Sequence, residues 1–233
     1  SGTKAAAAGG FTRVATMPNT KPVIDSAIIV DGLKYKIADE GVVKVDIIGS
    51  LSKGLEGKEL SSMGGMSKAG VVAFSDDGRY VQNCDFMRKA MEYAGMFGKI
   101  VIDHCEDADL IEGGHMHEGV VSHELGLKGR PAVAEDIAVA RDILLAEATG
   151  TAVHIAHIST KNAVQMVRQA KAKGLKVTAE ATPQHMILTD EALRSYDPRF
   201  KVNPPLRSEE HRKAVVEGLV DGTIDAIVTD HAP

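Results

Sequence analysis

Short apolar segments alternate with longer amphipathic segments along almost the whole chain. The apolar segments are rich in valine and isoleucine and are apolar throughout, as strands covered on both faces should be. They occupy residues 11–17, 42–49, 71–74, 100–102, 152–158, 176–181 and 226–229. Parallel neighbours in a sheet need long crossover connections, which are usually helical. The alternation therefore predicts an α/β protein built on a parallel sheet.

The segments between these strands carry apolar residues at helical spacing. They predict helices over residues 26–40, 86–97, 134–148, 161–173 and 209–220. Residues 106–130 are rich in glycine and histidine and lack this periodicity, so we expect a long functional loop there. A left-handed cap is expected at the glycines that follow several helices, namely Gly41, Gly150, Gly174 and Gly222.

Two architectures fit this alternation, an open doubly wound sheet and an eight-stranded barrel. An open dinucleotide-binding sheet should carry a glycine fingerprint after its first strand, and this sequence has none. A barrel gathers its chemistry at the carboxyl ends of its strands. Polar residues follow nearly every predicted strand: Asn19, Asp76, Asp77, His104, His157, His185 and Asp230. We therefore predict an incomplete (β/α)8 TIM-type barrel with about seven of its eight strands. It would form one domain over residues 1–233, truncated at both ends.

Charge and cysteine usage restrict the partners of the chain. A formal net charge of −5 argues against a general binder of nucleic acid or anionic membranes, because either function needs a basic face. The two cysteines, Cys84 and Cys105, form no paired motif, which argues against a disulfide framework and favours a reducing compartment. No apolar run is long enough to cross a bilayer, and no secretory leader is present. These features predict a cytoplasmic protein.

Histidines and carboxylates at the strand ends are the ligand types that zinc prefers. The candidates are Asp77, His104, His157 and Asp230. Two metals about 3.5–4 Å apart can be held together by one bridging carboxylate. Each residue alone also has a structural interpretation, because a buried histidine is often a hydrogen-bonded core residue and an aspartate after a strand often caps a helix. His154 and His157 fall on opposite faces of a regular strand, so only one of them need face the site.

Six short motifs occur in a fixed order along the chain. They are Met17-Pro18-Asn19-Thr20, Ser75-Asp76-Asp77-Gly78, Asp103-His104, residues 154–160, Val202-Asn203-Pro204-Pro205-Leu206-Arg207 and Thr229-Asp230-His231-Ala232-Pro233. In this order they resemble the type I dihydroorotases, which belong to the amidohydrolase superfamily of metal-dependent barrels. The resemblance covers essentially the whole chain.

The resemblance implies a zinc-dependent cyclic amidohydrolase of de novo pyrimidine biosynthesis, which interconverts L-dihydroorotate and N-carbamoyl-L-aspartate. It implies one or two Zn²⁺ ions, with Asp77 close to both metals and His104 and His157 on the second. Asp230 would ligate the first metal and act as general acid and base while a metal-bound hydroxide attacks the ring carbonyl. Asn19 and Asn203 would hydrogen-bond the substrate. Ligand histidines need an oriented second nitrogen, and residues such as Asp103 are candidates for this partner.

The sequence also departs from the family pattern. The family's first strand ends in a His-x-His pair followed by an arginine that binds the substrate carboxylate, and neither can be placed on the strands of this chain. His115-Met116-His117 has the His-x-His form, but it lies in a glycine-flanked segment where a solvated or substrate-lid role is expected. His185 is expected to be a hydrogen-bonded core residue with no metal role.

Two alternative functions stay open. Hydantoinases, dihydropyrimidinases and allantoinases usually bridge their metals with a carboxylated lysine, and residues 71–80 contain no lysine, so a hydantoinase-like activity ranks second. The other alternative is a non-catalytic dihydroorotase-like scaffold that binds aspartate transcarbamoylase. The resemblance also allows for a homodimer.

Overall fold

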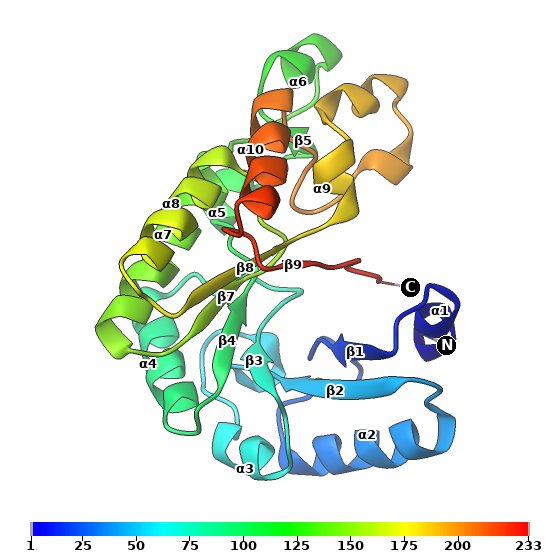
Figure 1. Ribbon diagram of the computed structural model, residues 1–233, viewed down its shortest axis with the longest axis vertical. Coiled ribbons are helices and arrows are strands. Elements are labelled where there is room, and N and C mark those ends of the chain that lie inside the picture. The colour runs from blue at the N-terminus through cyan, green and yellow to red at the C-terminus, as the bar shows by residue number, and fades with distance from the viewer. Residues whose placement is uncertain (1, 233) are drawn as a thin grey trace. The chain divides into compact units, whose positions relative to one another are not determined.

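The protein is described by a computed structural model that covers residues 2–232, so Ser1 and Pro233 lie outside the described residues. These residues divide into two compact units, one of residues 2–103 with residue 232 and one of residues 104–231. In both units parallel strands alternate with helices, as the order of the labelled elements in Figure 1 shows.

The first unit has a parallel sheet whose strands follow chain order. Within residues 2–103 the strands are β1 (Arg13–Thr16), β2 (Lys44–Gly49), β3 (Ala73–Ser75) and β4 (Ile100–Asp103). Each pairs with the next in parallel, with Arg13 opposite Lys44 and Ala73 opposite Ile100. The helices of this unit are α1 (Gly2–Ala8), α2 (Ala27–Glu40), η1 (Lys53–Leu55), α3 (Met63–Lys68) and α4 (Cys84–Gly95).

Fully buried apolar side chains hold the helices of this unit against its sheet. Phe74 of β3 and Met66 of α3 are both completely buried, and burial of side chains of this size stabilises a fold by roughly 1.5–3 kcal/mol each. Gly49 ends β2 between them, since a Cβ there would lie 2.9 Å from Met66 Sδ and 3.0 Å from Phe74 Cε1. The missing side chain thus lets α3 and β3 pack closely beside β2.

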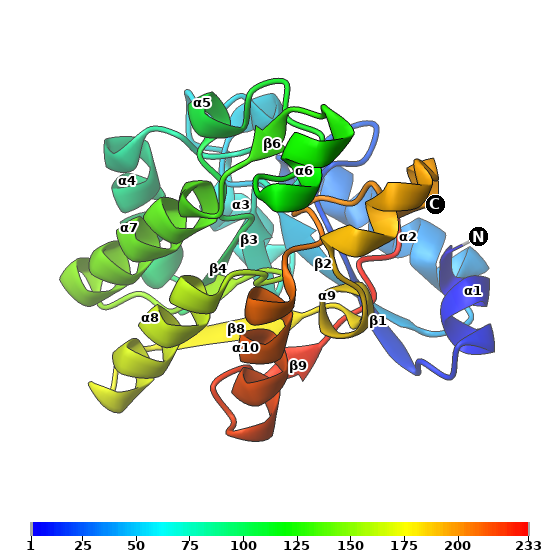
Figure 2. The same cartoon turned by 90° about the horizontal axis from the view of Figure 1, so that it is seen from above.

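The second unit contains a longer series of elements. Within residues 104–231 the strands are β5 (Met116–His117), β6 (Gly129–Arg130), β7 (Val153–Ile155), β8 (Val177–Ala181) and β9 (Ala226–Ile227). β7, β8 and β9 pair in parallel, with Val153 opposite Val177 and Glu180 opposite Ala226. The helices are α5 (Ala108–Ile111), α6 (Val120–Leu125), α7 (Val133–Thr149), α8 (Lys161–Ala172), α9 (Pro183–Ile187), η2 (Asp190–Ser195), η3 (Pro198–Phe200) and α10 (Glu209–Val220). α7 and α8 lie side by side in both Figure 1 and Figure 2.

All seven predicted strands and all five predicted helices occur among residues 2–232, with ends shifted by a few residues. Gly150, Gly174 and Gly222 have the expected positive φ. The prediction at Gly41 is wrong, because its φ is −73°. Glycine is needed there for a close approach instead, since a Cβ would lie 2.5 Å from the Ile37 carbonyl oxygen.

The expectation of a long loop over residues 106–130 is also wrong in part, because this segment contains α5, β5, α6 and β6. β5 and β6 pair in parallel, with Met116 opposite Gly129 and His117 opposite Arg130. Met116 is fully buried in a small apolar cluster with Val121, Leu193 and Leu206. The cluster gives the segment a core of its own, which explains why it folds although it lacks a clear periodicity.

The buried Asp76 carboxylate fixes the carboxyl end of β3. It accepts hydrogen bonds from the backbone N–H groups of Leu51 and Ser52, at 2.8 and 3.0 Å, and from the Ser52 hydroxyl. These contacts join the chain after β2 to the residue next to Asp77. The position of Asp77 in the first unit therefore depends on a charged group that is 2% exposed.

We expect Asp76→Ala to lower the free energy of unfolding by at least about 2 kcal/mol, because two buried N–H groups lose their acceptor. Asp76→Asn keeps one acceptor oxygen and should cost less. Urea unfolding followed by circular dichroism measures both, with Asp31→Ala on the exposed side of α2 as the control. Equal stability of the Asp76→Ala and Asp31→Ala variants would contradict this role.

Candidate active site

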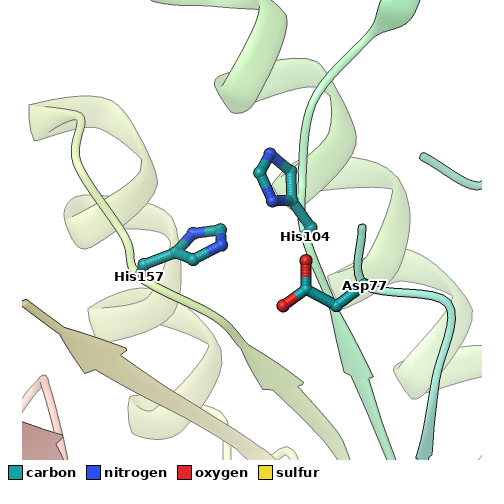
Figure 3. Close-up of side chains that lie close together, drawn as sticks. All are labelled: Asp77, His104 and His157. Carbon is teal, nitrogen blue, oxygen red and sulfur yellow. The ribbon is translucent and has the colours of Figure 1, made fainter. Parts of the chain in front are cut away.

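His104 and His157 lie side by side in the second unit, although 52 residues separate them in the sequence. His104 directly follows the last residue of β4, and His157 comes two residues after β7. Their ring centroids are 4.4 Å apart with an angle of 75° between the planes, and their nearest ligand atoms lie within 4.8 Å. Each residue is only 5% exposed. Figure 3 shows the two rings facing one another and also labels Asp77, which follows β3 in the first unit.

The chain turns sharply at His157, whose φ is +33°. A non-glycine residue in this region is uncommon and persists where the surrounding structure holds it. The backbone N–H groups of Ser159 and Thr160 donate to one oxygen of the Glu135 carboxylate, at 2.7 and 3.0 Å. The N–H of Ile158 donates to the Glu180 carbonyl at 2.8 Å. These three bonds fix the turn that carries His157.

Glu135 is itself held by a buried ion pair with Arg207. Arg207 Nη2 lies 3.4 Å from the Glu135 carboxylate, and its Nε donates to the Ser159 hydroxyl at 3.1 Å. Burial raises the pKa of Glu135, although the Arg207 charge and the hydrogen bonds from Ser159 and Thr160 act in the opposite direction. Arg207 Nη1 also donates to the Arg130 carbonyl at 3.1 Å. One guanidinium therefore connects the His157 turn, α7 and β6.

A carboxylate orients the ring of His104. Its Nε2 lies 3.1 Å from a carboxylate oxygen of Glu106, whose side chain is completely buried. Burial raises the pKa of Glu106, but the hydrogen bond and charge of His104 together with the charges of Arg130 and Arg207 outweigh it, so the pKa lies below its ordinary value. With Nε2 on the carboxylate, Nδ1 is the nitrogen that a metal would take. Glu106, which was not among the predicted residues, is thus an acid that orients His104.

Asn203 lies next to His104 in the same unit. Its Nδ2 is 3.4 Å from His104 Nε2, and its Oδ1 accepts a hydrogen bond from Arg130 Nη1 at 2.5 Å. The second unit therefore brings together two predicted metal ligands, His104 and His157, and one predicted substrate residue, Asn203. The signal for Asn203 in the sequence was its place in the motif of residues 202–207.

Two further predicted residues lie together in the first unit. Asp77 caps its own turn, because its carboxylate accepts from the Gly78 N–H at 2.7 Å. Gly78 has a φ of +95°, and a Cβ there would lie 2.8 Å from Asn19 Nδ2, so the turn and the Asn19 amide are in close approach. The remaining predicted residue, Asp230, follows β9 in the second unit with a φ of +47° and an exposed side chain.

Two other histidines, His154 and His185, have structural partners. His154 contacts Glu180 at 2.9 Å and Thr178 at 2.7 Å on the neighbouring strand. His185 is buried as expected, with Nε2 donating to the Pro204 carbonyl at 2.9 Å and Nδ1 2.7 Å from the Thr182 hydroxyl. The expected solvated role of the His115-Met116-His117 segment is wrong for His117, which is 7% exposed.

His117 is poorly suited to bind a metal because a cation lies beside it. Its Nδ1 is 3.4 Å from Arg207 Nη1, and its ring packs edge-on against His211 with centroids 5.3 Å apart. Burial and the charges of Arg207 and His211 lower the pKa of His117 to about 3. A metal ion on the His117 ring would therefore lie beside a fixed positive charge.

A family model described as Dihydro-orotase-like matches residues 1–163. A protein named dihydroorotase from Pelotomaculum thermopropionicum is 58% identical over 232 residues, which is 100% of this chain and 54% of the relative. A dihydroorotase from Geobacter metallireducens is 54% identical over 233 residues, or 55% of its own length. The chain thus spans about half the length of the curated relatives it matches.

Solved structures share the fold at lower sequence identity. An L-hydantoinase (dihydropyrimidinase) from Arthrobacter aurescens matches with a TM-score of 0.85 and 23% identity, over 98% of this chain and 52% of its own. A dihydropyrimidinase from Brevibacillus agri matches with a TM-score of 0.79 and 23% identity, over 100% of this chain and 52% of its own. This likeness confirms the predicted α/β fold class, an incomplete (β/α)8 barrel. Within residues 2–232, no helix is long and apolar enough to cross a membrane.

The neutral ring of His185 predicts a loss of stability in acid. Burial lowers the pKa of His185 from 6.5 to about 4, so the unfolded chain takes up a proton at a higher pH than the folded protein does. The free energy of unfolding therefore decreases as the pH falls below 6.5 towards 4. The decrease from this group is about 2 kcal/mol between pH 7 and pH 5.

The test compares urea unfolding at these two pH values for the wild type and for His185→Gln, which keeps a donor for the Pro204 carbonyl. The variant is expected to be less stable at pH 7 but to lose less on acidification. His123→Gln, at an exposed position in α6, should retain the wild-type pH dependence. The same slope in His185→Gln as in the wild type would contradict the interpretation.

Proposed function

Because the chain belongs to the dihydroorotase-like family, we propose that it acts as a dihydroorotase, a hydrolase that opens and closes the cyclic amide of L-dihydroorotate. The open-chain partner in this reversible reaction is N-carbamoyl-L-aspartate. The observation that carries the proposal is the buried pair of His104 and His157, with the first ring oriented by Glu106. The relatives named dihydroorotase at more than half identity support the choice of substrate.

The chemistry of the donor atoms fits a zinc ion. Two buried imidazoles with ligand atoms within 4.8 Å of one another, one of them hydrogen-bonded to a carboxylate, are typical of a site for a borderline divalent metal. We assign His104, His157, Asp77 and Asp230 as ligands of one or two Zn²⁺ ions. Asp77 and Asp230 are included because of their places in the ordered family motifs. When bound, the metal would polarise the ring carbonyl and lower the pKa of water.

The chain's own residues would supply the proton transfer and the substrate contacts. Asp230 would accept a proton from the attacking water and deliver it to the ring nitrogen as the carbon–nitrogen bond breaks. Its carboxylate suits this role because it is exposed at the carboxyl end of a strand and can reach a ligand there. Asn19 and Asn203 would hold the ring through their amide groups.

A hydantoinase-like activity ranks second. The solved structures named hydantoinase and dihydropyrimidinase are at most about a quarter identical to this chain, so they support its fold and not its substrate. An aspartate at residue 77 in place of a carboxylated lysine favours the dihydroorotase branch. Cytoplasmic location, a homodimer and association with aspartate transcarbamoylase stay predictions, and so does a single domain over residues 1–233.

The proposal is tested by assaying hydrolysis of L-dihydroorotate and of hydantoin by the zinc-loaded protein and by Asp230→Asn. We expect turnover of L-dihydroorotate to exceed that of hydantoin, and the variant to lose about 10²–10⁴-fold in kcat as a general acid and base is removed. Asp221→Asn, on the exposed surface of the same unit, should keep full activity. Full activity of Asp230→Asn would exclude the assigned role, and preferred turnover of hydantoin would favour the second function.

The orientation of His104 gives a separate prediction for metal binding. Glu106→Gln retains the shape of the side chain but weakens the hydrogen bond to the ring, which should lower zinc affinity by roughly 10–100-fold. Competition with a chromogenic chelator measures this without any substrate. Glu112→Gln, an exposed position just after α5, is the matched control. Unchanged zinc affinity in the Glu106 variant would show that the carboxylate does not support the ligand.

A further inference from the structure

We propose that the outer face of α7 binds the same face of a second copy of this chain, with the two α7 helices packed in antiparallel directions. The resemblance to the dihydroorotases allows for a homodimer but does not indicate which residues would form it. This face carries none of the residues that we assign to metal binding, substrate binding or proton transfer. The contact therefore does not depend on the proposed function.

α7 carries apolar residues on two opposite sides. Those of its inner side are at most 4% exposed and are Ala134, Ala138, Val139 and Ala146. Those of its outer side, Val133, Ile137 and Leu144, are 46%, 49% and 63% exposed. A helix on the surface of a protein usually has a polar outer face, whereas a helix that is apolar all round is usually covered on all sides. The composition of α7 therefore indicates a helix that is covered on its outer side as well.

The outer apolar residues of α7 form one continuous row. Its members, Val133, Ile137, Ala140 and Leu144, follow one another at intervals of four, three and four residues. This is the spacing of the a and d positions at which two helices of a coiled coil meet. The row thus forms a seam along which a second helix can pack.

A groove between α7 and α8 runs beside this row and has a volume of about 440 Å³. α7 lines it with the first three residues of the row, and α8 lines it with Met166 and three amide side chains. Asp136 is the one charged side chain among the described residues that line the groove, and it already accepts hydrogen bonds from the Thr160 hydroxyl and the Asn162 amide. A partner would therefore fill the groove without desolvating an unpaired charge, as is typical at the centre of a protein interface.

The row is complementary to itself when the second helix runs antiparallel. A two-fold axis between Ile137 and Ala140 places Ile137 of each copy opposite Ala140 of the other. The same axis places Val133 opposite Leu144. A large side chain then faces a small one next to the axis, so the two helices can approach closely. A two-fold contact requires a patch that fits itself in this way, which favours a second copy over an unrelated partner.

Charges at the two ends of the seam favour the antiparallel direction. Glu147 is exposed near the C-terminal end of α7. Lys161, which pairs with Glu210 of its own chain, is exposed at the first residue of α8. That residue lies beside the first turn of α7, because Asn162 donates to Asp136 at 2.9 Å. An antiparallel pair brings Glu147 of each copy towards Lys161 and the N-terminus of α8 of the other copy, whereas a parallel pair would bring two Glu147 side chains together.

The test is analytical ultracentrifugation of the chain and of Ile137→Glu at protein concentrations from about 1 to 100 μM, a range in which an interface of standard size remains associated. We expect a dimer for the wild type. The variant should have a dissociation constant at least about 100-fold higher, because it would bury a carboxylate against apolar side chains. Val220→Glu, at an 85% exposed apolar position in α10, should dimerise like the wild type. Circular dichroism and urea unfolding show whether each variant remains folded.

Cross-linking tests the direction of the helices without burying a charge. Both cysteine variants carry Cys84→Ser, which removes the exposed cysteine. Val133→Cys is mixed with Leu144→Cys under oxidising conditions, and each is also oxidised alone. We expect covalent dimers in the mixture and few or none with Val133→Cys alone, because the two-fold axis places residue 133 of one copy opposite residue 144 of the other.

A wild type that is monomeric over the whole concentration range would overturn the proposal. A dimer that Ile137→Glu leaves intact would also overturn it, because the contact would then lie on another face. Covalent dimers of Val133→Cys alone would exclude the antiparallel arrangement. If Ile137→Glu does not fold, cross-linking between residues 133 and 144 decides instead. Neither measurement uses zinc or L-dihydroorotate, so failure of this contact and failure of the proposed function are distinguished.

Discussion

The buried ion pair between Glu135 and Arg207 is the interaction on which the candidate site of the second unit depends. The Glu135 carboxylate accepts two backbone N–H groups from the turn after His157, and Arg207 bridges that carboxylate, the Ser159 hydroxyl and the Arg130 carbonyl. A buried charge pair costs much of its attraction in desolvation, so its net contribution to stability is small. Its value here is geometric, since it fixes segments that are far apart in the sequence.

The positive φ of His157 shows why such a support is needed. Outside glycine, this backbone region is uncommon, and a residue remains there when its surroundings over-determine the conformation. The turn is bound on one side by Glu135 and on the other by the backbone of β8. These bonds hold the ring of His157 beside that of His104. The polar residues behind the site therefore determine its geometry as much as the two histidines do.

Local patterns allowed most of the fold to be predicted. The strands and helices were read from periodicity that is contained in each segment, and the order of short motifs indicated His104, His157 and Asn203. The segment of residues 106–130 was misread because strands of two residues carry no periodicity. The sequence did not indicate the roles of Glu106, Glu135 and Arg207, because a charged residue is normally expected to be exposed. The partner of a buried charge can also be far away in the sequence, as in the Glu135–Arg207 pair, whose members are 72 residues apart.

The way in which Arg130 is held has a consequence for the thermodynamics of binding. A free arginine side chain has roughly 2 kcal/mol of rotamer entropy to lose when it is immobilised. The bonds to Gly114 and Asn203 remove that freedom when the protein folds. Asn203, which we propose as a substrate contact, is fixed by the same bond, so association with its amide would be less opposed by entropy than at a mobile surface side chain.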